Sequence, residues 1–270
     1  KRFNGSNYVQ RVVMKAIKHD IAIYAAHTNL DNVPQGVNKR ICDTIGLSNL
    51  SILAPKKGLL KKLYTFCPVD KADQVRMALF NAGAGHIGNY DQCSFNSEGI
   101  GTFRGSNNTN PYVGQQGELH RENELRIEVV FPAWKENAIT TALRSAHPYE
   151  EVAVDVVALE NSLGTVGSGM VGELETEMEE LSFLTQLKSV MQTNCVRYTP
   201  LLGKTVKRVA VCGGAGSFLL SNALRAQADV FVTGDYKYHE FFDAEGKIVI
   251  ADIGHYESEQ FTIQLFRDLL

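Results

Sequence analysis

Histidine and carboxylate side chains follow three short apolar segments of this sequence, and together they have the composition of a metal or acid–base site. In open α/β sheets, ligands bind at the carboxyl ends of the strands, where the connecting loops converge. We therefore expect the three groups to surround a single site. They are His27 with Asp31, Asp235 with His239, and Asp252 with His255 and Glu259.

The pair His255 and Glu259 is the most specific of these. A spacing of four residues places both side chains on one helical face, with Cβ atoms about 5–6 Å apart. Imidazole and carboxylate together suit Zn²⁺, Mn²⁺ or Fe²⁺. The same spacing also occurs on solvated helix faces, and the preceding apolar strand and glycine turn favour the metal site. Asp31, at another strand end, would supply a third ligand.

Two further histidines have open roles. His27 could be a metal ligand, a proton shuttle beside the metal, or a buried structural histidine. His239 lies one turn into a predicted helix, where it could act as a general base or orient a phosphate. A polar residue near a helix start is the alternative for His239.

The glycine-rich segment 213–217 separates a predicted strand from a predicted helix. It could bind phosphate through backbone N–H groups or simply form a tight turn. It lacks the Gly-Lys-Ser/Thr of a Walker loop and does not fit G-x-G-x-x-G, so no dinucleotide cofactor is predicted. The polar cluster 147–151 could line a ligand pocket or only connect a helix to a strand.

The elements that position these residues form two patterns. At both ends of the chain, strands alternate with single helices, which predicts parallel βαβ units and a sheet covered on both faces. This pattern comprises predicted strands at 21–26, 170–174, 195–199, 208–212, 230–233 and 247–251, and predicted helices at 9–17, 37–45, 178–191, 218–226, 238–244 and 255–269. A further motif, Gly164 to Gly169, reads as a flexible junction.

The middle of the chain follows the order β-α-β-β-α-β with one extra hairpin strand, which predicts a ferredoxin-like module. Its predicted strands are 62–67, 91–95, 101–104, 125–131 and 152–159, and its predicted helices are 72–82 and 134–145. We therefore predict an α/β fold: a split, mostly parallel α/β domain formed by 1–60 and 161–270, with a ferredoxin-like (α+β) domain inserted at 61–160.

Composition excludes several classes of protein. The 270 residues are 44% hydrophobic and 21% charged, which is typical of a globular chain rather than a disordered one. No apolar run approaches the ~18 residues of a membrane helix. A net charge of -3 does not favour a nucleic-acid partner. Five scattered cysteines indicate reduced thiols and a cytoplasmic location.

Four segments in this order resemble the Nif-three-like family, whose members are often named GTP cyclohydrolase 1 type 2 homologues. The resemblance covers essentially the whole chain. Segments 101–104 and 147–151 match the longer bacterial members, which carry an insert. The four segments are His27-Thr28-Asn29-Leu30-Asp31, Gly213-Gly214-Ala215-Gly216-Ser217, Thr233-Gly234-Asp235-Tyr236-Lys237-Tyr238-His239 and Gly254-His255-Tyr256-Glu257-Ser258-Glu259.

The resemblance implies a dinuclear metal site in a toroidal homohexamer, with a PII/CutA-like inserted domain. Carried over by position, Asp31, His255 and Glu259 would bind two divalent metal ions (Zn, Fe or Mn), and His27 and His239 would be catalytic residues near them. Family members also carry two adjacent histidine ligands in a His-His-Pro segment that this sequence lacks. The start on Lys1 instead of Met predicts that this segment precedes the given chain.

Two functions are therefore expected. The first is a metal-dependent hydrolase acting on a nucleotide or phosphoester, with GTP ring opening as the activity that the resemblance implies. Two metals would activate a bridging water, and His27 or His239 would move protons. The alternative is a non-catalytic metal-binding regulatory or scaffold protein whose insert senses a small ligand. No membrane partner is expected.

Overall fold

The computed structural model describes residues 4–24 and 28–269. The chain divides into two compact units. Unit 1 comprises Lys1–Leu53 and Ser168–Leu270, and unit 2 comprises Ala54–Gly167. Unit 2 is therefore longer at both ends than the predicted insert, 61–160. One strand continues from unit 1 into unit 2 near residue 54, and another returns to unit 1 near residue 167.

Unit 1 contains a six-stranded sheet in the order β1-β6-β8-β9-β10-β7. The central strands β8, β9 and β10 pair in parallel, whereas β6 pairs antiparallel with β8 and β7 pairs antiparallel with β10. The strands are β1 (Leu47–Lys56), β6 (Leu163–Glu179), β7 (Arg197–Tyr198), β8 (Thr205–Ala215), β9 (Val230–Gly234) and β10 (Val249–Asp252).

The prediction of a mostly parallel sheet is thus correct only for the three central strands. Single helices connect β8, β9 and β10, and a parallel pair needs such a crossover. The strands β6 and β7 join the sheet with the opposite direction, which makes it mixed. Strand β1 was not predicted, because Leu47–Lys56 contains Pro55 and runs into the polar junction at Lys56-Lys57-Gly58.

Among its described residues, unit 1 contains six α-helices. They are α1 (Tyr8–Lys18), α2 (Val37–Ile45), α5 (Glu180–Val190), α6 (Leu220–Arg225), α7 (His255–Glu259) and α8 (Thr262–Leu269), with short 3-10 helices η3 (Ser217–Leu219) and η4 (Tyr238–Ala244). The predicted helix 255–269 is therefore two helices, and 238–244 forms a 3-10 helix.

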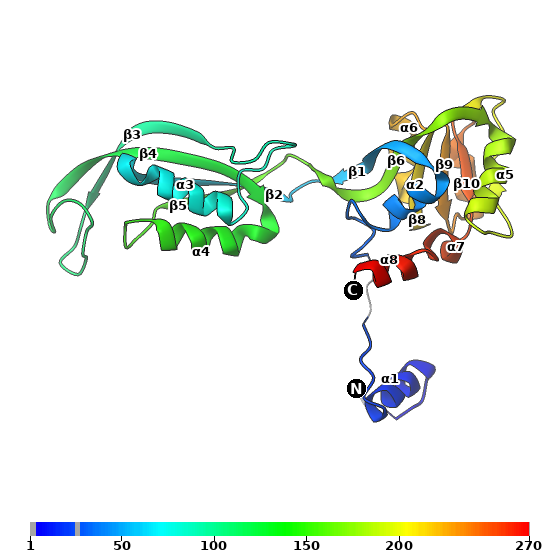
Figure 1. Cartoon of the computed structure of the whole chain (residues 1–270), viewed down its shortest axis with the longest axis horizontal. Coiled ribbons are helices and arrows are strands. Elements are labelled where there is room, and N and C mark those ends of the chain that lie inside the picture. Colours follow the sequence, from blue (N-terminus) through cyan, green and yellow to red (C-terminus); the bar gives the residue numbers. More distant parts are fainter. Residues whose placement is uncertain (1–3, 25–27, 270) are drawn as a thin grey trace. The chain divides into compact units, whose positions relative to one another are not determined.

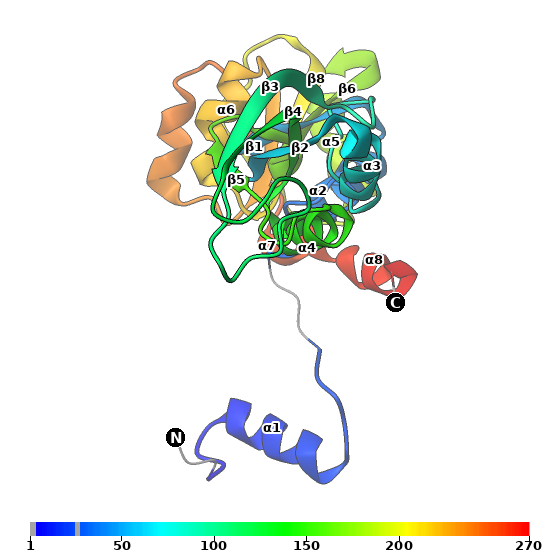
Figure 2. The same cartoon turned by 90° about the vertical axis from the view of Figure 1, so that its left-hand side faces the viewer.

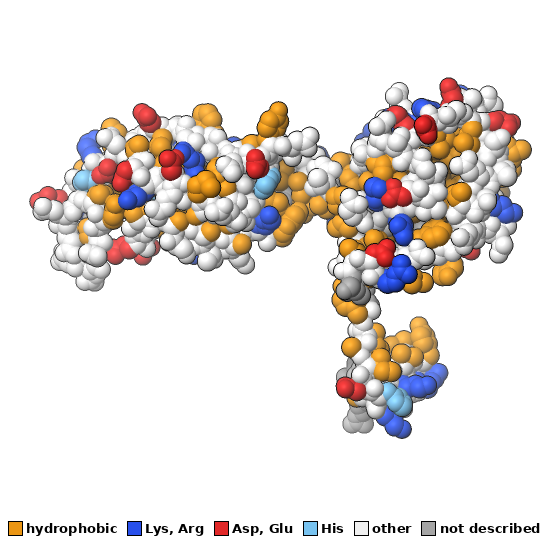
Figure 3. Space-filling view, viewed as in Figure 1, with side chains coloured by type: hydrophobic (Ala, Val, Ile, Leu, Met, Phe, Trp, Pro, Cys, Tyr) orange, Lys and Arg blue, Asp and Glu red, His pale blue; other side chains and the backbone are white. Residues whose placement is uncertain are grey.

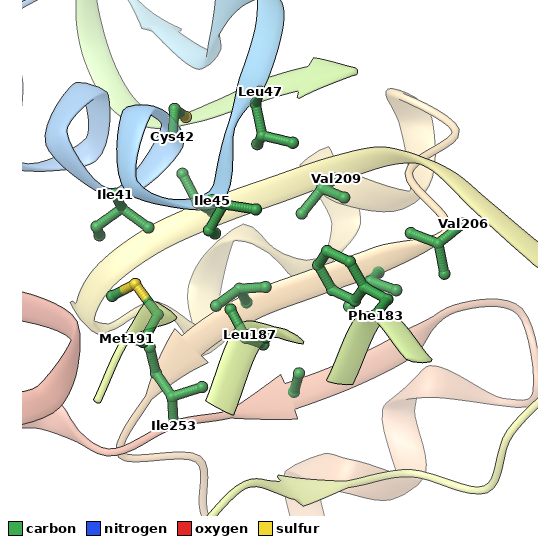
Figure 4. Packing of buried hydrophobic residues seen from close by; sticks show 14 of the residues in the cluster. Ile41, Cys42, Ile45, Leu47, Phe183, Leu187, Met191, Val206, Val209 and Ile253 are labelled. Carbon is green, nitrogen blue, oxygen red and sulfur yellow. The ribbon is translucent and has the colours of Figure 1, made fainter. Parts of the chain in front are cut away.

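One face of the sheet packs against α2 and α5. Ile41 and Ile45 of α2 and Phe183 and Leu187 of α5 form a cluster with Val209 of β8, and all five side chains are buried (Figure 4). The alternate residues of β8 point to the opposite face. Burial on both faces explains why the central strands read as continuous apolar runs.

The segment before α2 differs from the prediction. Ile21, Ile23 and Tyr24 are exposed and unpaired, so their predicted place in a buried strand is wrong, and 25–27 lie outside the described residues. Helix α1 is capped by Asn7, whose side chain accepts the Gln10 N–H. Figure 3 shows hydrophobic side chains along one side of α1 and basic ones along the other.

Unit 2 contains a four-stranded sheet in the order β3-β4-β2-β5, with every neighbouring pair antiparallel. Two helices, α3 and α4, lie side by side on one face of this sheet (Figures 1 and 2). The elements are β2 (Leu60–Pro68), η1 (Val69–Lys71), α3 (Ala72–Asn81), β3 (Phe95–Arg104), β4 (Leu119–Pro132), η2 (Ala133–Lys135), α4 (Glu136–Ala146) and β5 (Val154–Leu159).

The core of unit 2 follows the alternation of its strands. Ile127, Val129 and Phe131 of β4 are buried against Val75 of α3 and Ile139 of α4. The extra hairpin strand that the sequence predicted is absent from the described part of unit 2. Instead, β3 is one long strand, in which glycines that resembled strand ends are paired residues.

Among the described residues, no helix is both long enough and apolar enough to cross a membrane.

Candidate functional site

A cavity of about 340 Å³ lies in unit 1, next to the carboxyl ends of the parallel strands. Asp31, His255 and Glu259 all line it, so the structure brings Asp31 together with two residues that lie more than 220 positions later in the sequence. His239 is exposed in η4 and is not among the lining residues. His27 lies outside the described residues, and its predicted role stays a prediction.

Helix α7 presents His255 and Glu259 as the sequence predicts. It begins directly after Gly254, which has a φ of 93°, and the four-residue spacing leaves His255 Nε2 3.5 Å from Glu259 Oε2. Two donors at this separation, both bordering a cavity, have the spacing and chemistry for a shared divalent cation.

Asp235 fixes the orientation of His255. Its Oδ2 lies 2.7 Å from His255 Nδ1, so the proton of the ring is held at Nδ1 and Nε2 is directed to the Glu259 side. A metal-binding histidine in proteins usually donates its second N–H to such a carboxylate. The sequence pattern groups Asp235 with His239 and does not indicate its partnership with His255. Only the position of Asp235 at a neighbouring strand end pointed to it.

Negative charge surrounds the imidazole. The hydrogen bond to Asp235 and the charges of Glu259 and Asp31 raise the pKa of His255, against the opposing effect of burial. Burial, with the charges of Asp31 and Glu259, raises the pKa of Cys212 to about 12, so this lining thiol stays protonated at neutral pH. The site thus has the electrostatics of a cation site.

Asn38 connects the Asp31 segment to the sheet. Its Nδ2 donates to the Asp31 carbonyl at 2.8 Å, and its Oδ1 accepts the Gly213 N–H at 2.9 Å. Asn38 is buried on α2, where a polar residue on an inward helical face was the available signal for it. This bridge holds the loop that carries Asp31 against the end of β8.

The glycine segment forms a wall of the site. The Gly214 N–H donates to Ser258 Oγ at 2.9 Å, and that hydroxyl donates to the His255 carbonyl at 2.7 Å. Since the N–H groups of Gly213 and Gly214 are both occupied by side chains, they do not face a phosphate. Of the two predicted roles for 213–217, the close turn is the one that this geometry supports.

Gly214 also leaves room for the candidate ligands. Its φ is 64°, and a Cβ built there would lie 2.7 Å from Glu259 Oε1 and 3.2 Å from His255 Cε1. Only glycine allows the backbone to approach both side chains this closely.

Asp252 does not belong to the cavity, although the sequence placed it beside His255. It is 2% exposed, forms an ion pair with Arg197, and accepts the N–H groups of Tyr236 and Gly254, each at 2.9 Å. A carboxylate with these partners supports the turn into α7 and has a structural role.

The donor set fits a metal in part. His255 and Glu259 form a pair with an oriented imidazole, and Asp31 borders the same cavity. Within residues 4–24 and 28–269, no group of three or more His, Cys, Asp or Glu side chains is close enough to hold a metal ion. The described residues thus supply part of a coordination sphere.

The chain is similar to known proteins over most of its length. Residues 1–270 match the family model Duf34/NIF3 (NGG1p interacting factor 3). Proteins named GTP cyclohydrolase 1 type 2 homolog from Halalkalibacterium halodurans and Bacillus subtilis are 45% and 44% identical over 248 residues, which is 91% of this chain. The chain spans 66% of the length of each of these two relatives.

A solved structure is also similar. The crystal structure of a Bacillus cereus protein related to NIF3 superposes with a TM-score of 0.82 at 40% identity, covering 99% of this chain and 73% of that one. The family match over the whole chain, the identity to curated relatives and this superposition lead to one conclusion: the chain belongs to the Duf34/NIF3 family.

Proposed function

We propose that this chain is a metal-dependent hydrolase acting on a nucleotide or phosphoester. The observation that carries the proposal is the cavity in which Asp31 borders the His255–Glu259 pair, with His255 oriented by Asp235. The similarity to proteins named GTP cyclohydrolase 1 type 2 homolog supports GTP as the first substrate to test.

In this proposal Asp31, His255 and Glu259 hold two divalent ions of Zn, Fe or Mn, together with ligands outside the described residues. When bound, such ions lower the pKa of a coordinated water and polarise the atom under attack. Asp235 keeps His255 in the tautomer that offers Nε2, and Asn38 holds the Asp31 loop in place. His27 and His239 are proposed to transfer protons.

The test combines metal content with turnover. Protein reconstituted with Zn²⁺, Mn²⁺ or Fe²⁺ is assayed with GTP and with a panel of phosphoesters, and its metal is measured by mass spectrometry. Glu259→Gln and Asp31→Asn are expected to lower turnover at least about 100-fold. Glu257→Gln, the same change on the same helix but outside the cavity lining, is the control. Full activity of metal-stripped protein would contradict the proposal.

Unit 2 is proposed to be a ferredoxin-like insert of the PII/CutA-like type. Its β-α-β-β-α-β order and the strand order β3-β4-β2-β5, with both helices on one face, support this assignment. Residues 1–60 and 161–270 then form one metal-binding domain split by the insert. The large cavity of unit 2, described below, favours a second candidate function, a regulatory protein whose insert senses a small molecule.

Assembly and location are proposed with the function. The family resemblance leads us to propose a homohexamer. Light scattering after size-exclusion chromatography is expected to give six times the mass of the chain, and a mass equal to one chain would contradict the hexamer. All five cysteines are free, which supports a reducing, cytoplasmic environment.

A further inference from the structure

A cavity of about 620 Å³ lies in unit 2, and its lining residues are separate from those of the candidate metal site. Glu124 and Arg126 of β4 line it. They alternate with Leu125 and Ile127, which pack in the core beneath α3 and α4, so the cavity opens on the other face of the sheet. Its volume is in the range of small-molecule sites.

Glu124 is the feature that points to a ligand. Glu124 is only 9% exposed and forms no ion pair with another described residue, a combination that is rare for a carboxylate. The Tyr149 hydroxyl donates to Oε1 at 2.8 Å, and among the described residues no other hydrogen bond reaches this carboxylate. Oε2 lies beside Gly101, another lining residue of the cavity, and has capacity to accept a hydrogen bond.

Two glycines of β3 make room beside this carboxylate. Gly99 pairs directly with Glu124, and a Cβ built on Gly99 would meet no atom within 4 Å. At Gly101 a Cβ would overlap Glu124 Oε2. Both positions lack positive φ, so glycine is not required by the backbone there. What these glycines provide is a hollow next to the buried charge.

Aromatic rings form the walls of this hollow. The Tyr149 ring lies 6.2 Å from the ring of Phe103 and 6.2 Å from the ring of Tyr112, each measured between centroids. Burial and the hydrogen bond to Glu124 raise the pKa of Tyr149, so its hydroxyl remains a donor to Glu124 at neutral pH.

The remaining charges leave the cavity acidic. Its lining contains four carboxylates, at Glu98, Glu124, Glu150 and Glu151, and two guanidinium groups, at Arg104 and Arg126. The Arg126 charge is directed elsewhere, because it lies 3.1 Å from Glu128 and 4.6 Å from the centroid of the Tyr64 ring. Glu150 accepts the Asn110 N–H at 2.9 Å, so part of its acceptor capacity is used within the protein.

We propose that this cavity binds an organic ammonium cation of metabolite size. Its charged nitrogen lies at Glu124, and its alkyl or ring portion packs against Phe103, Tyr112 and Tyr149. A carboxylate surrounded by aromatic faces is the chemistry that recognises substituted ammonium groups, through charge pairing and cation–π attraction. The proposal does not depend on the metal site of unit 1.

The test is isothermal titration of the full chain with choline and with benzyltrimethylammonium. The neutral isostere of choline, 3,3-dimethylbutan-1-ol, is the control ligand. Millimolar or tighter binding is expected for at least one cation, with the neutral isostere at least about tenfold weaker. Glu124→Gln keeps an acceptor for Tyr149 and is expected to weaken cation binding at least about tenfold. Glu118→Gln, an equal charge change on an exposed loop of unit 2, leaves it unchanged.

A second variant fills the hollow without touching Glu124. Gly99→Val places its side chain in the open space beside the carboxylate, in a backbone conformation that valine favours, and is expected to abolish binding while unit 2 stays folded by circular dichroism. Equal binding of the cation and its neutral isostere, no binding of either cation, or unchanged affinity in Glu124→Gln would overturn the proposal. So would a change of oligomeric state in Gly99→Val without cation binding, which would assign this face to a second copy of the chain.

Discussion

Single side chains in this protein hold their protonation states through burial, and the cysteines illustrate it. Burial raises the pKa of Cys42 to about 12 and that of Cys67 to about 11, and both thiols are 0% exposed. Thiolates are the reactive form of cysteine, so neither is expected to react while the chain is folded. Cys195 is exposed.

This difference gives a prediction for alkylation. At pH 8 iodoacetamide is expected to modify Cys195 at least about 100-fold faster than Cys42 or Cys67, because the buried groups need both unfolding and a lost proton. Peptide mass spectrometry of the native protein over time measures the rates. Equal rates at the three positions in folded protein would contradict the burial of Cys42 in unit 1 and of Cys67 in unit 2.

Burial favours the neutral form of His147, and two hydrogen bonds fix the orientation of its ring. Its Nε2 donates to the Phe66 carbonyl at 2.9 Å, and its Nδ1 accepts the Tyr149 N–H at 3.1 Å. A proton on Nδ1 would oppose that N–H, and burial of the ring lowers the pKa of His147. The native state therefore disfavours the charged form.

The sign of the pH effect follows from this lowered pKa. Below the ordinary histidine value near 6.5 the unfolded chain takes up a proton that the native chain does not. Stability from His147 is present above about pH 6.5 and is lost as pH falls towards the lower native pKa. His147→Gln keeps the donor without titrating, so the loss of melting temperature between pH 7.5 and 5.5 is expected to be smaller in the variant. An identical loss would contradict the assignment.

At the scale of elements, the strand-to-helix connections decide where the candidate ligands lie. The end of β8 approaches α7 so closely that Gly214 has no room for a side chain. Gly203 offers a matched comparison, since its φ of 72° resembles the 64° of Gly214 but a Cβ there would meet no atom within 4 Å.

Gly203→Ala is expected to cost about 1–2 kcal/mol, which is the cost of the left-handed backbone alone. Gly214→Ala adds the overlap with Glu259 and is expected to cost at least about 1 kcal/mol more, with metal content reduced as well. Urea unfolding and metal analysis of both variants measure the difference. Equal costs with unchanged metal content would argue against close packing of Gly214 on Glu259.

The turn between β10 and α7 depends on Asp252. Because its carboxylate holds Arg197 and two backbone N–H groups while buried, Asp252→Ala leaves these partners unsatisfied. We expect a loss of about 2–4 kcal/mol in unfolding free energy, moderated because Arg197 is half-exposed. A calorimetric comparison with Asp252→Asn, which keeps one acceptor, measures it; a loss below about 0.5 kcal/mol would contradict the structural role.

Elements with strong local signals could be predicted from the sequence. The helix Val37–Ile45 has apolar residues at helical spacing and ends at Gly46, which adopts the left-handed conformation with a φ of 86°. The run 21–26 has an equally strong strand signal, but the strand prediction is wrong for its described residues, 21–24. Hydrophobicity says that residues favour burial but does not supply the neighbouring strand that would bury them.

At the scale of the molecule, the sequence alone did not predict how distant segments pair with one another. The prediction that Asp31, His255 and Glu259 gather at one sheet edge came from the rule that parallel strands share a ligand-binding edge. The three residues line one cavity, but Asp31 lies in a turn and does not follow a strand. Three features depend on contacts between residues in separate segments, which no local pattern encodes. They are the antiparallel pairing of β6 with β8, the bridge through Asn38, and the hydrogen bond of Asp235 to His255.

The central claim is that the cavity beside α7 in unit 1 holds divalent metal. Anomalous scattering measured from crystals of the full chain, grown with Zn²⁺, Mn²⁺ or Fe²⁺ and recorded on both sides of the absorption edge, tests it most directly. The account predicts an anomalous peak within coordination distance of His255 Nε2 and the Glu259 carboxylate, about 2.0–2.2 Å from each, and its loss in Glu259→Gln but not in Glu257→Gln. A map without a peak at this cavity, from crystals in which the metal is measurably present, would contradict it.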